Sequence, residues 1–281
     1  MNARAALFDL YGDHLRSRGG RASVAALVRL LAPLGIAAPA VRTAISRMVR
    51  QGWLDHVRLP QGPGYMLTPK GVSRLDKAAA RIYRAGPVNW SGRWHMLVLE
   101  PVRDRQRRER LRAGLAYLGY APLSETTWIG PHPSPELDAL RISAYVFDAT
   151  LAGDPRELVA QAWDLCAIAQ AYEQWLADAE VLVGSLPDDA HVDQVFAVRS
   201  RLLNGWRNFL FRDPGLPAEL LPPGWPGEKA RLYFEQEAAR LLPAATAFVE
   251  RNMDGAFDVA PHAPLVSPGA AARGATAEEI R

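Results

Sequence analysis

The sequence predicts an α+β protein that consists of three folded parts and a short tail. Three observations support this fold class: helix patterns followed by a hairpin pattern in the first part, alternating strand and helix patterns in the second, and helix periodicity in the third. The 281 residues, 49% of them hydrophobic and 22% charged, suffice to bury a large core without disulfides. The predicted domains cover residues 1–86, 90–152 and 153–258, with a disordered tail at residues 259–281.

Two helices are expected at the start of the chain. In residues 3–15 apolar side chains recur every three or four positions, and Gly19 and Gly20 end this helix. Ser23 is a typical N-cap for a second helix, which residues 33–35 close with a proline and a glycine. The apolar faces are Leu7, Phe8, Tyr11 and Leu15 on the first helix, and Val24, Leu27, Leu30 and Leu31 on the second.

A third helix and a hairpin follow. Pro39 suits the first turn of a helix, and Gly52 stops it. Strand patterns at residues 53–59 and 65–68 flank a turn at residues 60–64, whose two glycines supply positive φ. Three helices followed by a hairpin form the order of a winged helix-turn-helix. The inward positions of the third helix are Val41, Ile45, Met48 and Val49.

The middle part begins after a fourth helix, expected at residues 68–84, and a break at residues 86–89. Its patterns follow the order β-α-β-β-α-β, which is typical of a ferredoxin-like domain. The expected elements are a strand at residues 94–99, a helix at 104–118, strands at 121–125 and 126–129, a turn at 135–139 and a strand at 140–147.

The third part is expected to be helical. A long helix is predicted over residues 155–179, and two more over residues 190–211 and 228–252. The apolar stripe of the long helix is Leu158, Ala162, Cys166, Ala169, Tyr172 and Leu176, which makes Cys166 a small core residue. The stripe of the helix at residues 190–211 is Val192, Val195, Phe196, Leu202, Leu203, Trp206 and Phe209. Arg199 falls inside that stripe and needs either a carboxylate or an anionic ligand, because an unpaired buried charge is costly.

The charge distribution separates the first part from the rest. Residues 1–84 contain 14 Lys and Arg against 4 Asp and Glu, whereas the remainder is acidic by seven charges. Such a basic segment is typical of a polyanion-binding module, and a basic face without a partner is the alternative. The single cysteine fits a reducing cytoplasm. The longest stretch without a charged residue, 259–272, is too short for a membrane span, so a cytoplasmic protein without a membrane partner is expected.

The third helix presents a polar face at the position of a recognition helix. Arginine forks onto guanine, and threonine and serine reach phosphates or base edges. The alternative is a solvated basic face. The predicted DNA-binding residues are Arg42, Thr43, Ser46, Arg47 and Arg50 on this helix, with Arg58, Gln61 and Tyr65 in the hairpin.

Sequence motifs for catalysis are missing. The chain contains no Gly-x-x-x-x-Gly-Lys, Gly-x-Gly-x-x-Gly, Gly-x-Ser-x-Gly or His-Glu-x-x-His pattern. Its six histidines are scattered, and Asp188, Asp189 and Asp193 are best read as a solvated helix start. No catalytic residue, metal site or cofactor is therefore predicted.

Three stretches of sequence occur in the order known from one family. The first, residues 7–53, reads LFDLYGDHLRSRGGRASVAALVRLLAPLGIAAPAVRTAISRMVRQGW. The second, residues 94–130, contains WHMLVLE, RRERLRAGLAYLGY and ETTWIGP. The third, residues 197–227, reads AVRSRLLNGWRNFLFRDPGLPAELLPPGWPG. Over residues 5–252 the chain resembles the PaaX family, the bacterial repressors of aerobic phenylacetate catabolism.

The resemblance implies a homodimeric repressor that binds operator DNA and is released by an aryl-CoA thioester, which is phenylacetyl-CoA in the type members. A site for such a ligand combines arginines for the phosphates with aromatic side chains for the rings. The expected effector-binding residues are Arg199, Arg201, Trp206, Arg207 and Arg212. The arginine run at residues 103–112 is a competing contact for the phosphates.

An enzyme is the alternative function, either a metal-dependent nuclease or a thioester-processing protein that carries a nucleic-acid-binding domain. The middle part also resembles the small ferredoxin-like nucleases of CRISPR systems, which place an acidic metal ligand at the end of the first strand. Here that strand ends with Leu99, Glu100 and Pro101, without the expected Asp. The prediction is therefore a protein without enzymatic activity.

Overall fold

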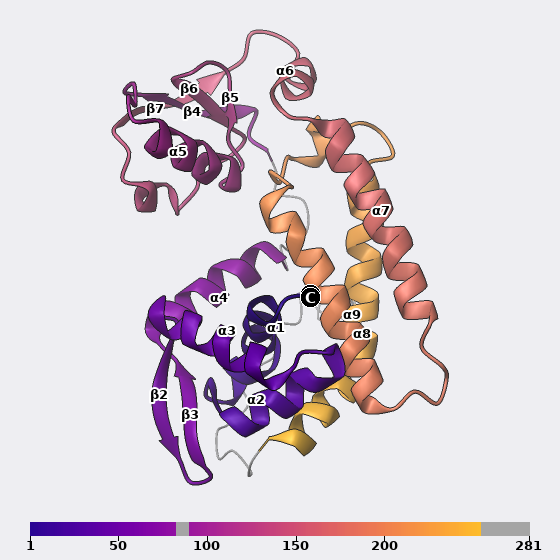
Figure 1. Cartoon of the computed structure of the whole chain (residues 1–281). Coiled ribbons are helices and arrows are strands. Elements are labelled where there is room, and N and C mark those ends of the chain that lie inside the picture. Colours follow the sequence, from indigo (N-terminus) through magenta and orange to yellow (C-terminus); the bar gives the residue numbers. More distant parts are fainter. Residues whose placement is uncertain (83–89, 254–281) are drawn as a thin grey trace, which may run out of the picture. The chain divides into compact units, whose positions relative to one another are not determined.

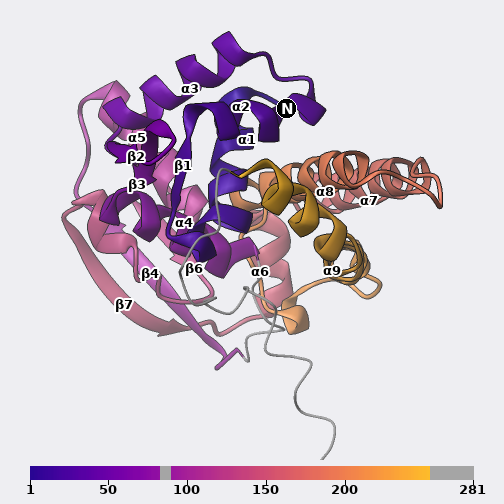
Figure 2. The same ribbon diagram turned by 90° about the horizontal axis from the view of Figure 1, so that it is seen from below.

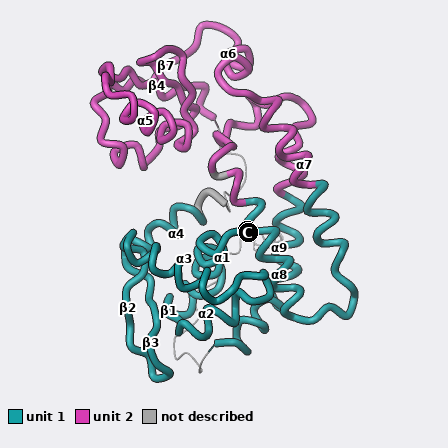
Figure 3. Tube along the Cα trace, viewed as in Figure 1, with its two compact units in different colours: residues 1–85, 177–206, 232–281 teal, residues 86–176, 207–231 magenta. Residues whose placement is uncertain are grey.

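The computed structural model describes residues 1–82 and 90–253. These residues form two compact units (Figure 3). Unit 1 comprises the described residues of 1–85, 177–206 and 232–281, and unit 2 comprises those of 86–176 and 207–231. Each unit combines helices with one antiparallel sheet, which confirms the predicted α+β class.

Unit 1 begins with the first predicted helix, which the structure divides into three consecutive segments. The first is α1, Ala3–Leu10 (Figure 1). A π-helical turn, Tyr11–Leu15, and a 3-10 turn, Arg16–Arg18, follow it. Gly19 ends the run with a φ of 79°. Leu7, Tyr11 and Leu15 are fully buried, as the apolar spacing predicts.

The second and third helices also follow the predicted caps. α2, Val24–Leu31, starts at Ser23, whose Oγ accepts a hydrogen bond of 3.0 Å from the backbone N–H of Ala26. A 3-10 turn, Ala32–Leu34, leads to Gly35 in the left-handed conformation. α3, Ala38–Arg50, then runs to the hairpin.

The wing is a three-stranded sheet in the order β1-β3-β2. Its strands are β1 (Arg21–Ser23), β2 (Leu54–Leu59) and β3 (Gly62–Leu67). Leu59 pairs with Gly62, so the turn is two residues long and shorter than predicted. Gly62, with a φ of 120°, is a turn glycine, but Gly64 lies inside β3, where a Cβ would approach the carbonyl oxygen of Ala22 to 2.8 Å. Strand β1 was not predicted, because three residues are too few for a recognisable pattern.

The fourth helix, α4, occupies Pro69–Ile82. The predicted end of this helix at residue 84, the break at residues 86–89 and the tail at residues 259–281 lie outside the described residues. Among the described residues, no single helix has the length and apolar composition of a membrane span. The bent pair Val24–Leu34 and Ala38–Arg50 meets that criterion only on length and composition.

Unit 2 contains a four-stranded antiparallel sheet in the order β5-β6-β4-β7. The first strand is therefore central, as in a ferredoxin-like domain, and Leu97 pairs with both Trp128 and Val146. The second helix of that fold is reduced to a 3-10 turn, η4, so the last strand starts four residues later than predicted. The elements are β4 (Arg93–Leu99), α5 (Arg105–Tyr117), β5 (Ala121–Pro122), β6 (Thr127–Gly130), η4 (Leu137–Leu140) and β7 (Ala144–Thr150).

The predicted long helix at residues 155–179 is wrong, because two helices occupy this segment: α6 (Pro155–Ala162) and α7 (Leu165–Gly184). Trp163 is extended, and Asp164 caps α7 by accepting a hydrogen bond of 2.9 Å from the N–H of Ala167. The remaining elements are α8 (Val192–Arg207), η5 (Asn208–Phe211), η6 (Ala218–Leu220) and α9 (Pro226–Asn252).

This break also changes which side chains of the segment are buried. Cys166 is exposed, so its prediction as a core residue is wrong. The break places Cys166 in the first turn of α7, whereas Tyr172 and Leu176 of the predicted stripe are buried further along this helix. The buried stripe of α7 is Ile168, Tyr172, Leu176, Ala179 and Val183.

The core of unit 1 joins segments from both ends of the chain. α8 and α9 run side by side (Figures 1 and 2), and Phe196 packs on Phe248 with ring centroids 4.8 Å apart. Phe196, Phe248 and Val249 belong to the same apolar cluster as the buried side chains of α1, α2 and α3. The N-terminal helices therefore share one core with α8 and α9.

Candidate nucleic-acid interface

The polar face of α3 is fully accessible in unit 1. Its opposite face is buried and consists of Val41, Ala44, Ile45 and Met48. The exposed residues are Arg42, Thr43, Ser46, Arg47 and Arg50, as the helical spacing predicts. Thr43 Oγ1 donates a hydrogen bond of 2.9 Å to the carbonyl oxygen of Pro39.

The charge on this face is not neutralised within unit 1. α3 contains no acidic residue, and among the residues that the structure describes no carboxylate forms an ion pair with Arg42, Arg47 or Arg50. Three guanidinium groups along 13 residues suit a ligand with repeated negative charges and acceptor atoms, such as the edge of a DNA groove.

The three predicted wing residues differ in their environments. Arg58 and Gln61 are exposed near the tip of the hairpin, whereas Tyr65 is half-buried. The ring of Tyr65 lies 4.8 Å from that of His56, and its carbonyl oxygen accepts a hydrogen bond of 3.3 Å from Tyr11. Tyr65 thus connects the wing to the core.

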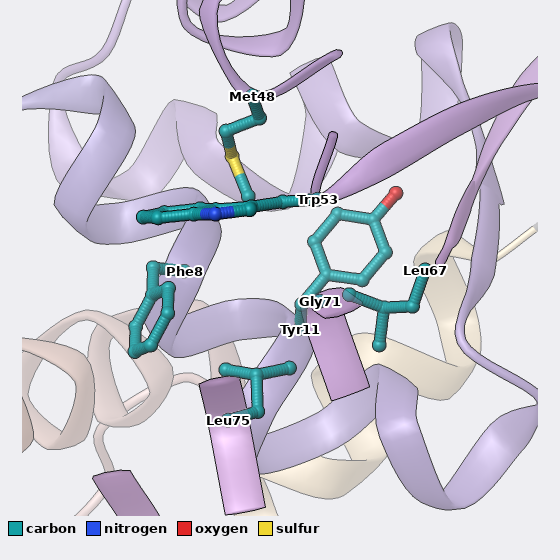
Figure 4. Close-up of a pocket in the computed structure, with 7 residues that line it drawn as sticks. All are labelled: Phe8, Tyr11, Met48, Trp53, Leu67, Gly71 and Leu75. Atoms are coloured by element: carbon teal, nitrogen blue, oxygen red, sulfur yellow. The ribbon is translucent and has the colours of Figure 1, made fainter. Parts of the chain in front are cut away.

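A small apolar pocket lies behind α3. It has an empty volume of about 180 Å³, below the usual size of a ligand pocket, and is too narrow to admit a water molecule. Figure 4 shows the indole of Trp53 between the side chains of Met48 and Tyr11. Burial raises the pKa of Tyr11, so its phenol remains a hydrogen-bond donor. The lining residues are Phe8, Tyr11, Met48, Trp53, Leu67, Gly71 and Leu75.

Arg199 forms a buried ion pair with a carboxylate, which is one of the two kinds of partner that the sequence analysis left open; the other was an anionic ligand. Its two terminal nitrogens contact the two carboxylate oxygens of Asp13, and Nε donates a hydrogen bond of 2.9 Å to the carbonyl oxygen of Ala238. Burial lowers the pKa of Arg199 to about 10, so the group stays charged at neutral pH. Nearby, Asn204 Nδ2 donates a hydrogen bond of 3.0 Å to the buried Asp9.

His14 completes this polar cluster. Its Nε2 lies 3.1 Å from the Asp13 carboxylate that Arg199 already neutralises. Burial, together with the positive charge of Arg18, lowers the pKa of His14 to about 3. The neutral ring therefore adds no charge to the Asp13–Arg199 ion pair. No local pattern pointed to Asp13 or His14, because Arg199, with which Asp13 pairs, lies 186 residues from Asp13 along the chain.

The other predicted effector residues lie in different surroundings. Trp206 is buried and stacks on Phe234 with centroids 4.9 Å apart. Arg201 and Arg212 are exposed, and Arg207 is half-buried. Arg199, Arg201 and Trp206 belong to unit 1, and Arg207 and Arg212 to unit 2. The effector site itself stays a prediction.

The described residues contain no group of three or more His, Cys, Asp or Glu side chains placed to hold a metal ion. Asp188, Asp189 and Asp193 are exposed around the start of α8. Glu100, which follows β4, is exposed as well.

The fold and the basic face of α3 define a protein of the winged helix-turn-helix class with a ferredoxin-like domain. Three family models match the chain in order: "PaaX-like protein" at residues 2–71, "PaaX protein central Cas2-like domain" at residues 87–151, and "PaaX-like protein C-terminal domain" at residues 163–251. The transcriptional repressor PaaX of Escherichia coli (strain K12) is 30% identical over 259 residues, which cover 87% of this chain and 82% of that protein. The chain belongs to the PaaX family.

A solved structure shares this organisation. The uncharacterized protein Rv0674 from Mycobacterium tuberculosis matches with a TM-score of 0.56 at 26% sequence identity. The match covers 88% of this chain and 98% of that chain, so the similarity extends over all three parts.

Proposed function

We propose that this protein is a transcriptional repressor that binds operator DNA through α3 and the wing. The observation that supports this most directly is the exposed, unneutralised basic face of α3, opposite a fully packed apolar face. Membership of a family that includes a transcriptional repressor from Escherichia coli agrees with it. On α3, Arg42 and Arg47 read bases, and in the wing Arg58 contacts phosphate.

The proposed DNA-binding form is a homodimer. One recognition helix buries too little surface for tight specific binding, and two copies related by a twofold axis place two such helices on one duplex. The operator is then an inverted repeat whose half-sites lie about one helical turn, ~34 Å, or a multiple of it apart.

The proposed effector is an aryl-CoA thioester such as phenylacetyl-CoA. The resemblance of the whole chain to the PaaX family supports this ligand, and the exposed Arg201 and Arg212 are the predicted residues with accessible guanidinium groups. Release of DNA requires that the thioester bind the DNA-free conformation more tightly than the DNA-bound one, because equal affinity shifts no equilibrium.

A gel-shift experiment on the promoter region of the protein's own gene tests the proposal. We expect a retarded complex whose affinity falls by ~10³–10⁵ between 50 and 200 mM salt, for a dimer with ~6–10 phosphate contacts. Phenylacetyl-CoA should dissolve the complex, whereas acetyl-CoA and free coenzyme A serve as matched controls. A complex that is insensitive to salt would contradict the electrostatic interface, and one that no acyl-CoA alters would contradict the effector class.

The same preparation tests whether the protein acts without catalysis. Labelled DNA and RNA are incubated with the protein and Mg²⁺ or Mn²⁺, and we expect both substrates to remain intact. Metal-dependent cleavage that copurifies with the protein would favour the nuclease alternative.

A further inference from the structure

The helix α5 of unit 2 carries a dense cluster of exposed arginines. Residues 90–152 contain eight arginines, and six of them lie within ten consecutive residues at the start of this helix. The same ten residues contain two acidic side chains and no lysine. The α5 arginine cluster consists of Arg103, Arg105, Arg107, Arg108, Arg110 and Arg112, all of them exposed.

This arrangement opposes the stability of the helix that carries it. The first turn of α5 has no acidic residue, although the positive end of the helix dipole favours one there. Like charges at Arg108 and Arg112, four positions apart, destabilise a helix further. Helix stability alone therefore does not account for so many arginines at the start of α5.

Few carboxylates neutralise the cluster. Arg105 pairs with Glu109 at 2.9 Å, and both side chains are exposed. Asp104 is the N-cap and accepts a hydrogen bond of 2.6 Å from the N–H of Arg107. Within the described parts of the chain, no carboxylate lies within ion-pair distance of the Arg107 or Arg112 guanidinium groups.

The packing of α5 leaves the cluster facing outward. Leu111, Leu115 and Leu118 attach the helix to the sheet core through the side that contacts Leu97 and Trp128. Arg108 and Arg112 follow one another along one side of the helix, four residues or about 6 Å of rise apart, and Arg107 and Arg110 follow one another along another side, three residues or about 4.5 Å apart. Each of these rows matches a ligand with several negative charges along a line, and Arg107 and Arg112 each represent one row.

We propose that the α5 arginine cluster binds the phosphate backbone of duplex DNA, as a second contact in addition to α3 and the wing. Duplex DNA presents one negative charge per ~1.7 Å of helix axis, and guanidinium groups bind phosphate oxygens in a bidentate manner. The inference rests on the proposed function, since it assumes that the protein binds duplex DNA.

The test measures how the full-length protein binds a labelled 40-base-pair duplex of random sequence as the KCl concentration is varied. The variant is Arg107→Gln/Arg112→Gln. Each lost phosphate contact lowers the slope of log affinity against log salt by ~0.9, so we expect a slope smaller by about 2 per chain. The matched control is Arg141→Gln/Lys229→Gln, which removes the same charge from two exposed side chains of unit 2 outside the cluster, and it should retain the wild-type slope.

The melting temperature of each variant is measured to check that it folds. We expect the value for Arg107→Gln/Arg112→Gln to equal or exceed that of the wild type, because unfavourable charges are removed. A wild-type slope in this variant overturns the inference. An equal decrease in the control overturns it too, since the effect would then be one of net charge. Calorimetry with coenzyme A forms a separate arm: loss of coenzyme A affinity at an unchanged DNA slope assigns the cluster to the effector and overturns the inference.

These outcomes are distinguishable from failure of the proposed function. If the wild-type protein binds neither the random duplex nor its promoter region, the proposed function fails and this inference fails with it. If Arg47→Ala alters DNA recognition but Arg107→Gln/Arg112→Gln does not, only the inference about α5 fails.

Discussion

Asp13 and Arg199 form an ion pair whose side chains are 12% and 6% exposed, and this burial determines their energetics. Taking two charges out of water is expensive, and the pair is maintained because the contact is bidentate and Ala238 supplies a further acceptor. Removing one partner is much more damaging than removing both, because a lone buried charge has no compensation.

We therefore predict that Arg199→Met lowers the free energy of unfolding by about 3–5 kcal/mol. Asp13→Asn/Arg199→Met should recover most of that loss, because no charge is then left buried. Denaturant titrations monitored by circular dichroism measure both values. Arg16→Met, which breaks an ion pair with the half-exposed Asp76, is the control and should cost about 0–1 kcal/mol. Equal losses in the single and double variants would show that the pairing is not what matters.

The lowered pKa of His14 makes the stability of the protein depend on pH. Its pKa in the folded protein is about 3 and its ordinary value is 6.5, so below pH 6.5 the unfolded chain binds a proton that the folded protein does not. The stabilisation is fully present above pH 6.5 and is lost as the pH falls toward 3, by up to about 1.4 kcal/mol per pH unit.

The measurement compares the free energy of unfolding of the wild type and His14→Gln between pH 7.5 and 4.5. Carboxylates that titrate in this range are common to both proteins, so the difference isolates His14. We expect the wild type to lose stability more steeply on acidification. Parallel curves for the two proteins would contradict the buried neutral imidazole.

At the level of single residues, the sequence predicted whether a side chain is buried or exposed better than it predicted which residue that side chain contacts. The position of Arg199 within an apolar stripe showed that it needed an anion, but the partner Asp13 is 186 residues away, and no local pattern connects them. The exposed face of α3 followed directly from helical spacing, because both faces lie within one element. Cys166 was misassigned because the break at Trp163 and Asp164 places it in the exposed first turn of α7 and not in the middle of one long helix.

At the level of elements, predictions succeeded where a cap or a period marks the element. Ser23, Pro39 and Gly35 located α2 and α3. The pairing register of β2 and β3 was harder to predict from the sequence. The glycines in the hairpin permit several turn types, and only the pairing between the strands selects the two-residue turn. Strand β1 depends wholly on its pairing with β3.

The wing supplies a prediction at this scale. A Cβ at Gly64 would lie 2.8 Å from the carbonyl oxygen of Ala22 and 2.5 Å from the Leu59 side chain, so Gly64→Ala should push β1 away from β3. We expect a loss of about 1–3 kcal/mol in the free energy of unfolding. Gly153→Ala, where a Cβ meets open space, is the control. Thermal denaturation compares the two, and equal melting temperatures would contradict the close approach of the strands.

At the level of the whole molecule, the order of the three parts along the chain was predictable, but the composition of the compact units was not. Unit 1 combines the N-terminal helices with α8 and most of α9, and the contacts between them are both apolar and polar. Arg18 reaches Glu250 at 2.8 Å, and Arg29 donates a hydrogen bond of 2.9 Å to the carbonyl oxygen of Asn252. The predicted four-part division stays a proposal about the order of domains along the chain.

The shared core has a consequence for the proposed repressor. Phe196 of α8 and Phe248 of α9 lie in the same apolar cluster as the buried side chains of α1, and Arg199 of α8 pairs with Asp13, so a shift of α8 or α9 would change the packing beneath α1. The proposed release of DNA by an effector requires that α3 binds DNA in the first place, so DNA reading by α3 is the central claim.

The most direct test of this central element is the discrimination ratio, which is the affinity for an operator duplex selected by the wild-type protein divided by the affinity for a random duplex. We measure it at fixed salt for the wild type, for Arg47→Ala in α3 and for Arg58→Ala in the wing. Arg47→Ala should lower the ratio by about 5- to 150-fold, or 1–3 kcal/mol, because a base contact is lost in each half-site. Arg58→Ala should weaken both affinities and leave the ratio unchanged. Equal weakening on both duplexes by Arg47→Ala, or no weakening at all, would contradict the assignment of α3 as the helix that reads the operator.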